Sequence, residues 1–302
     1  MKSFNKKYLI LVFLLFSLNN IILKAQTQID TVRWGFYFTS VDETVANKIG
    51  ESLKYWVDFI KKKSNDKKVR DAVFISKRYT SISDFLNDVR KNKIEVISFP
   101  SLTYFKSGVN DYFYPVLTIS KSLESKYERY LIISNENGAD NIEKLNNAEL
   151  NIPKLYTDEL LITWIKSKFN IHDLSSKKNK IKIVRTTKTE IQLINSVFFN
   201  KIDYAVVSEA SYLLAKELNP QIKNKVKVLS TSPDFLYIVI AFNKKIKDYV
   251  AEKIINLCLN IHNSVEGRQI LNLIQAEKFY TVNDSDLGET KNLIKYLQSK
   301  IN

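Results

Sequence analysis

Hydroxyl-bearing side chains recur directly after short runs of branched and aromatic residues in this chain. Thr39 and Ser40 follow the run VRWGFYF, and Ser101 and Thr103 follow a second run, IEVISF. Hydroxyls and free backbone N–H groups at the start of a helix suit the binding of an oxyanion. The same residues are ordinary helix caps, and capping alone accounts for any single position. The recurrence, more than any one residue, favours a small anion as the ligand.

Side chains that could catalyse a reaction are few. His172 and His262 are the only histidines, and neither has a companion metal ligand at a useful spacing. The chain has no glycine-rich phosphate loop, no G-x-S-x-G sequence and no metalloprotease helix. The adjacent acids Asp158 and Glu159 would point to different sides of a helix, and Cys258 lies in an apolar run typical of a core. We therefore expect no enzyme activity, no catalytic residue, no cofactor and no metal ion.

Strand-like and helix-like patterns alternate in the first third of the chain. Runs of branched and aromatic residues predict strands over 32–38, 72–76 and 94–99. Apolar residues at helical spacing predict helices over 43–62 and 83–91. Strand, helix, strand, helix, strand in this order implies a parallel sheet with helices on both faces.

The same alternation returns in the remainder of the chain. Strands are predicted over 130–134, 149–152, 181–185, 204–207 and 235–242, and helices over 142–145, 158–169, 189–199, 208–218, 247–262, 265–274 and 286–300. We therefore predict an α/β protein of two lobes, each a mainly parallel sheet flanked by helices. Lobe 1 would comprise residues 26–125 and 235–302, and lobe 2 residues 126–234.

This architecture selects the residues that would meet a ligand, because ligands of open parallel sheets bind outside the carboxyl ends of the strands. Arg78 could form a bidentate bond with a phosphate or carboxylate. Glu209 could pair with an amino group of a zwitterionic ligand, or it is a first-turn helix acid with nothing to bind. The predicted ligand-binding residues are Ser40, Arg78, Tyr79, Ser101, Tyr104, Thr157, Asp158, Thr187 and Glu209.

The first 25 residues have the order of a secretory signal peptide. A lysine-containing start is followed by an apolar run over 8–18, and small Ala25 precedes polar Gln26. A transmembrane anchor is the alternative, but it needs about 20 apolar residues, and Asn19 ends this run. We expect a cleaved signal and a mature chain that is periplasmic or secreted.

The formal net charge of the whole chain is +14. Such a balance favours acidic partners, which are small anions, a membrane surface or nucleic acid. The charge is spread along the sequence, and its densest run, over 61–70, is expected to be a solvated loop. Because no nucleic-acid motif is present, we expect a small anionic solute as the partner, no nucleic acid, and a monomer.

Five segments carry a resemblance to a known family. They are RWGFYFTS, KIEVISFPSLTYF, YERYLIISNENGADNIEKLNNAEL, KIDYAVVSEASYLL and EGRQILNLIQAEKFYTVNDSDL. In this order and spacing, over residues 33–287, the chain resembles the phosphate/phosphonate-binding family of periplasmic substrate-binding proteins of ABC transporters. The resemblance implies a type II periplasmic-binding-protein fold with a ligand between the lobes, and an ABC transporter permease as partner.

The resemblance also implies which positions would contact the ligand. The contacts of the family fall near Tyr79, Tyr104, Thr157 and Glu209. Where the family usually has Ser-Thr-Ser-Gly, this chain has LYTDE over 155–159, and the two carboxylates would repel a dianion at that helix start. The resemblance predicts solute capture for a transporter. The altered segment keeps open the alternative of a ligand-sensing or degenerate binding protein that presents its surface to a membrane receptor.

Overall fold

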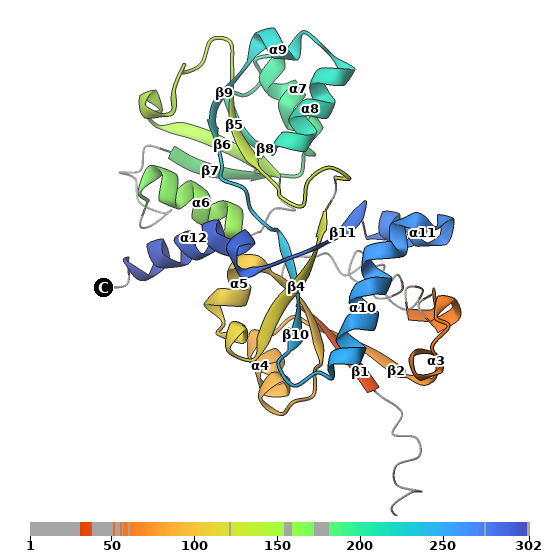
Figure 1. Ribbon diagram of the computed structural model, residues 1–302. Helices are drawn as coiled ribbons and strands as arrows, with labels where there is room; N and C mark the ends of the chain where they lie inside the picture. The colour runs from red at the N-terminus through yellow and green to blue at the C-terminus, as the bar shows by residue number, and fades with distance from the viewer. Residues whose placement is uncertain are drawn as a thin grey trace, which may run out of the picture.

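Two separate β-sheets, each with helices packed against it, make up the molecule (Figure 1). The computed structural model describes residues 31–37, 51, 55, 57–59, 61–120, 122–153, 159–171, 181–274 and 276–300. The predicted signal peptide lies outside these residues. None of the described helices is long and apolar enough to cross a bilayer.

The first sheet has six strands in the order β11-β4-β10-β3-β1-β2. β1 is parallel to β2 and β3, β10 is antiparallel to β3 and β4, and β11 is antiparallel to β4. The central strands β3 and β10 are almost wholly buried, which explains their continuous branched and aromatic composition. The strands are β1 Thr31–Tyr37, β2 Val73–Tyr79, β3 Val96–Pro100, β4 Phe113–Ser120, β10 Ile238–Asn243 and β11 Lys278–Thr281.

The helices around the first sheet begin at short polar side chains. Asp66, Ser81 and Ser264 cap α3, α4 and α11, because each side chain accepts a hydrogen bond from a backbone N–H of the first turn. The helices are α3 Lys67–Asp71, α4 Ile82–Arg90, α5 Ser101–Lys106, α10 Asp248–Asn260, α11 Val265–Leu273 and α12 Gly288–Gln298, with 3-10 turns η1 Val109–Asp111, η3 Ile261–Asn263 and η4 Asp284–Leu287.

The second sheet has five strands in the order β7-β6-β8-β5-β9. β6 is parallel to β7 and β8, and β5 is antiparallel to β8 and β9. Its strands are β5 Tyr130–Asn135, β6 Ala148–Pro153, β7 Ile181–Thr186, β8 Tyr204–Ser208 and β9 Val226–Thr231. Its helices are η2 Ile142–Lys144, α6 Glu159–Phe169, α7 Glu190–Phe198, α8 Glu209–Leu218 and α9 Ile222–Lys225.

Two crossing segments, residues 122–129 and 232–237, connect the sheets. They lie side by side, because Glu128 and Phe235 exchange two backbone hydrogen bonds of 2.8 and 3.0 Å. The helix α12 also links the two parts, since it packs on both α5 and α6 (Figure 1). Its Leu293 joins the apolar core of the second sheet, and the Tyr296 hydroxyl donates to backbone carbonyls just beyond and within α6.

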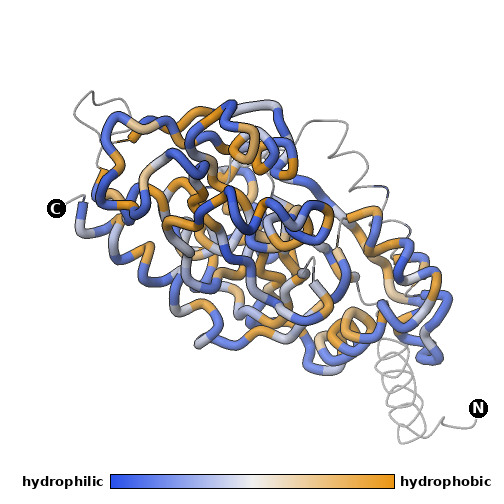
Figure 2. The backbone as a smooth tube through the Cα atoms, turned by 90° about the horizontal axis from the view of Figure 1, so that it is seen from above, coloured by the Kyte–Doolittle hydropathy of each residue, from blue (hydrophilic) through white to orange (hydrophobic). Residues whose placement is uncertain are grey.

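The predicted α/β architecture of two sheets flanked by helices is confirmed, with two corrections. The sheets are mixed and not mainly parallel, because the return strands β4 and β10 in one and β5 in the other bring antiparallel neighbours. Three described strands, β4, β9 and β11, were not predicted. Of the helix predicted over 43–62, residues 51, 55, 57–59 and 61–62 are described and helical. Figure 2 shows the hydrophobic segments mostly inside and the hydrophilic ones mostly at the periphery.

Candidate functional site

The carboxyl end of β1 and the start of α6, which belong to different sheets, lie close to each other. Lys106, the last residue of α5, forms an ion pair with Glu159, the first residue of α6. Burial raises the pKa of Tyr37, the last residue of β1, and the negative charge of Glu159 raises it further. Glu159 therefore stands where the two sheet units meet, at the strand ends that parallel α/β sheets use for ligands.

Ser101 is the predicted site residue with unused hydrogen-bonding capacity at this junction. It is the first residue of α5, directly after β3, and its backbone N–H donates to the Tyr237 carbonyl at 3.0 Å. Pro100, and not Ser101, is the N-cap of the helix, because β3 extends to Pro100 and the helix begins directly at Ser101. The Ser101 hydroxyl is fully buried and has no hydrogen-bond partner within the described part of the chain. A buried polar atom of this kind requires an explanation in a native protein.

At the start of α8, a carboxylate of the protein itself occupies the place that a bound anion would take. The carboxylate of Glu190, in the first turn of α7, accepts hydrogen bonds from the Ser208 backbone N–H, from the Ser208 hydroxyl at 2.8 Å and from the Ser211 hydroxyl at 2.6 Å. A carboxylate at a helix start satisfies the free donors and the positive end of the helix dipole. The start of α8 is therefore occupied from within. Sequence reasoning missed Glu190, because nothing in its local pattern indicates a partner 18 residues away.

Glu209 has a partner that neither interpretation of the sequence included. Its carboxylate lies 3.4 Å from Arg129 Nη1, and Arg129 Nε donates to Asp234 Oδ1 at 2.6 Å. The hydrogen bond that Arg129 donates to Asp234 and the charge of Glu209 raise the pKa of Arg129, which keeps it cationic. Arg129 and Asp234 belong to the two different crossing segments. This triad, Arg129–Asp234–Glu209, thus ties both segments to the first turn of α8.

Comparison with known proteins identifies the family. Residues 54–287 match the family described as ABC transporter, phosphonate, periplasmic substrate-binding protein. The chain belongs to this family. Its members are solute-binding proteins and not enzymes, and the protein is the substrate-binding component of a phosphonate-type ABC transporter. No curated protein matches the chain.

Solved structures of periplasmic binding proteins share the fold. A binding-protein component of an ABC phosphonate transporter from Pseudomonas aeruginosa is 12% identical with a TM-score of 0.55, over 90% of this chain and 87% of its own. A Xanthomonas citri protein bound to ATP is 11% identical with a TM-score of 0.60, over 90% and 98%. PhnD1 from Prochlorococcus marinus, in complex with methylphosphonate, is 11% identical with a TM-score of 0.57, over 90% and 99%. The predicted type II periplasmic-binding-protein fold is thereby confirmed.

In this substrate-binding protein, Arg78 and Tyr79 lie within β2 and not after it, which corrects their predicted position. β2 continues to Tyr79 because it stays paired in register with β1 as far as Tyr37. Arg78 is exposed on this edge strand. Tyr79 is only 4% exposed, and its hydroxyl donates to Asp88 of α4 at 2.8 Å. Burial and this hydrogen bond raise the pKa of Tyr79, so it is a neutral phenol packed against α4.

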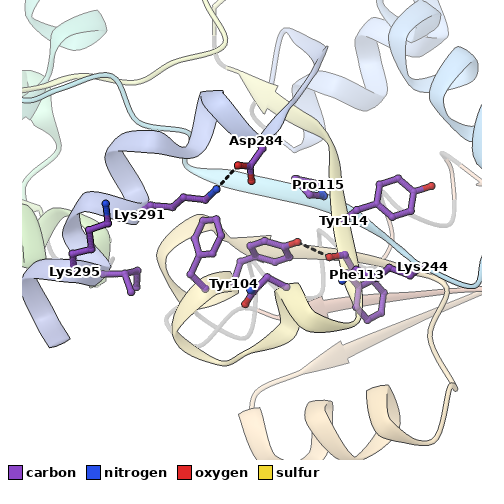
Figure 3. A pocket seen from close by; sticks show the side chains of 11 residues that line it. Tyr104, Phe113, Tyr114, Pro115, Lys244, Asp284, Lys291 and Lys295 are labelled. Atoms are coloured by element: carbon purple, nitrogen blue, oxygen red, sulfur yellow. Dashed lines mark hydrogen bonds and ion pairs between the residues drawn. The ribbon is translucent and has the colours of Figure 1, made fainter.

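The Tyr104 hydroxyl is already bonded within the first sheet unit. It is buried and donates to the Phe113 carbonyl at 2.8 Å, and the Tyr104 ring lines a cavity (Figure 3). That cavity lies by the start of β4 and the end of β10, whereas the carboxyl end of β3 pairs with the start of β10 at Ile238. Tyr104 and Phe105 of α5 both line it, so the cavity reaches the helix that carries Lys106.

The remaining predicted residues are either exposed or beyond description. Thr187 is an exposed residue in the bend after β7. Ser40, Thr157 and Asp158 lie outside the described residues, as does His172. Among the residues that the structure describes, no group of three or more His, Cys, Asp or Glu side chains could hold a metal ion. Ser101 and Glu209 thus each follow a strand and bond to one of the crossing segments. The ligand contacts of the predicted residues stay predictions.

Proposed function

We propose that this protein captures a small anionic, phosphate- or phosphonate-like solute between its two sheet units and delivers it to the membrane permease of an ABC transporter. The meeting of the β1 end, the α5 end and the α6 start at Glu159 carries this proposal. The methylphosphonate complex of the structurally similar PhnD1 supports the chemical class of the solute. The two lobes would be residues 26–125 with 235–302, and 126–234, moving about the crossing segments.

The charges and hydroxyls at the junction indicate where the anion would bind. The start of α8 is filled by Glu190, so an external anion there would meet a carboxylate. The Ser101 hydroxyl can donate to an anion, and Lys106 supplies a positive charge at the other end of the same short helix. Thr157 and Ser40, which the sequence places after neighbouring strands, would complete the set of hydroxyl donors. We therefore place the anion against the first-sheet side of the junction.

A calorimetric titration with methylphosphonate, phosphate, phosphite and sulfate tests the function. We expect saturable binding of at least one of these anions. Ser101→Ala removes one buried donor to a charged group, which is worth about 1.5–3 kcal/mol and weakens affinity about tenfold or more. Ser299→Ala, which removes an exposed hydroxyl bonded within the end of α12, is the matched control and leaves the affinity unchanged. Equal affinities of Ser101→Ala and the unmodified protein would refute this placement, and failure of all four anions to bind would refute the solute class.

A sensing or degenerate binding protein is the second candidate. The internal carboxylate of Glu190 at α8 favours it, because one helix start of the second sheet is closed to anions. The two functions differ in their downstream partner. Ligand-loaded protein that stimulates ATP hydrolysis by the reconstituted permease and ATPase supports transport. Tight ligand binding without any such stimulation supports sensing.

A further inference from the structure

The densest positive run of the sequence, residues 61–70, is folded against the first sheet unit and is not the solvated loop that its composition predicts. It is helical except at residues 64–66, and its second half lies in α3. Asp66 caps α3 and forms an ion pair with Lys253 of α10 at 3.6 Å, and Val69 packs in the apolar core beside the sheet. The run is therefore held in place as part of a defined surface.

Most positive charges of this run are not compensated by acids. Residues 61–71 contain six cationic side chains and two acids, Asp66 and Asp71. Of the six cations, Lys63 is paired, because its ammonium group lies 3.9 Å from Glu266 of α11. The other five form no ion pair with another described residue, and they are Lys61, Lys62, Lys67, Lys68 and Arg70. The surface therefore keeps an excess of positive charge.

Like charges lie close together where this run meets α10. Lys68 Nζ lies 5.1 Å and Lys247 Nζ 5.9 Å from the centre of the Tyr249 ring, so the two ammonium groups are within about 11 Å of each other. This separation is close to the screening length in physiological salt, so both charges act on the same area of a partner. The start of α10 adds no net charge, since two acids offset its two cations: Lys247, Lys253, Asp248 and Glu252.

The chain enters the first sheet unit beside this surface. β1 begins at Thr31, and the register partner of Thr31 is Val73, which lies two residues beyond the end of α3 (Figure 1). The segment that precedes β1 is therefore attached next to α3. Twelve residues separate the apolar run over 8–18 from β1, and they can span at most about 43 Å. A membrane that holds the apolar run is thus within reach of this surface.

We propose that the basic surface formed by Lys61, Lys62, Lys67, Lys68 and Arg70 docks on the anionic headgroups of a lipid membrane. Phosphate headgroups complement its charge, and each Lys or Arg near a negatively charged leaflet adds to an attraction that fades within a Debye length. A basic surface without an inserted chain binds reversibly.

This contact keeps the exported protein close to the membrane that contains the permease. It does not compete with the solute, because α3 lies beside the start of β1, whereas the proposed solute site lies at the carboxyl end of the same strand.

Co-sedimentation of the exported protein with lipid vesicles tests the docking. We expect the protein to partition at least tenfold more strongly onto phosphatidylcholine vesicles that contain phosphatidylglycerol than onto phosphatidylcholine alone, and high salt to abolish the difference. No solute takes part, so the result does not depend on the proposed transport function. Equal partition onto both kinds of vesicle, no partition onto either, or retention only when the permease is present in the vesicles would overturn the proposal.

Two double variants locate the contact. Lys67→Gln with Lys68→Gln removes two charges from the basic surface and should weaken binding to the phosphatidylglycerol vesicles about tenfold or more, since each lysine near the leaflet is worth about fivefold. Lys223→Gln with Lys225→Gln, on α9 of the second sheet, removes the same net charge and is the matched control, with little loss expected. Thermal unfolding confirms that both variants are folded before sedimentation. Equal losses in the two double variants would show that net charge alone matters and that the basic surface is not the docking site.

Discussion

At the scale of single residues, Asp88 shows how this protein keeps a buried carboxylate charged. Asp88 Oδ2 accepts from Lys77 Nζ at 2.7 Å and from the Tyr79 hydroxyl at 2.8 Å, and Lys93 Nζ lies 3.7 Å from Oδ1. The hydrogen bonds from Lys77 and Tyr79 lower the pKa of Asp88 by more than burial raises it. The carboxylate thereby fastens α4 to β2. Tyr79, which the sequence suggested as a ligand contact, is one of the two β2 residues that donate to Asp88.

This network predicts a pH-dependent stability. Because the pKa of Asp88 is lower in the folded protein than its unfolded value of about 3.9, the folded carboxylate binds fewer protons than the unfolded one. Its contribution is complete above pH about 4 and is lost as the pH falls through the folded pKa. We expect Asp88→Asn to lower the free energy of unfolding by about 1–3 kcal/mol at pH 7. Urea unfolding at pH 7 and at pH 3 measures the difference.

The control for Asp88 is a carboxylate without such bonds. Asp71, exposed at the end of α3, forms no ion pair with another described residue, and Asp71→Asn should leave the unfolding midpoint at both pH values nearly unchanged. The gap between the Asp88→Asn variant and the unmodified protein should narrow at pH 3. A gap that is the same at both pH values would show that the charge of Asp88 does not contribute.

At the scale of secondary-structure elements, Glu190 joins α7 to α8 through the free donors of a helix start. Glu190→Ala leaves the Ser208 N–H and two serine hydroxyls without their acceptor. We expect a loss of about 1–3 kcal/mol in the free energy of unfolding. Glu217→Ala, an exposed acid near the other end of α8, is the control and should change stability little. Chemical denaturation of both variants decides between this capping role and a surface acid without effect.

Most elements could be predicted from the sequence because their patterns are local. The central strands β3, β5 and β10 are continuous apolar runs, and α7 begins at a capping box of Thr189 and Gln192, so their ends fall close to the predicted ones. The three strands that were missed lack such patterns. β4 contains Pro115 beside a register shift, β9 is a half-exposed edge strand, and β11 has four residues.

The candidate site was harder to predict than the fold, because its contacts join distant residues. Asp234 lies 105 residues from its partner Arg129, and no spacing rule connects them. Ser101 was found because it directly follows a strand. Tyr104, one turn further along, was also selected, but its hydroxyl is already bonded to the Phe113 carbonyl. A strand-end rule identifies the position of a residue and not the direction of its side chain.

At the scale of the whole molecule, the described contacts between the two sheet units range from a shared apolar core, in which Leu102 of α5 and Leu293 of α12 pack with the second sheet, to one exposed ion pair. The crossing segments, the packing of α12 on α5 and α6, and the Lys106–Glu159 ion pair join them. Both side chains of that pair are about half exposed, at 53% and 42%, so it adds at most about 1 kcal/mol to stability. A contribution of this size does not determine the fold, but it can shift an equilibrium between two lobe arrangements severalfold.

Because the ion pair has a small effect on stability but can shift the lobe equilibrium, it gives a prediction for ligand affinity. Lys106→Ala and Glu159→Ala each remove the ion pair between α5 and α6, so each should lower the apparent affinity for the solute about two- to fivefold while the unfolding temperature changes by little. If the two residues act through their ion pair, the double variant is no weaker than either single variant. High salt should abolish the difference between the variants and the unmodified protein, because it screens an exposed pair. Additive losses in the double variant would mean that Lys106 and Glu159 contact the solute separately, and small-angle scattering with and without solute would then show equal closure in all four proteins.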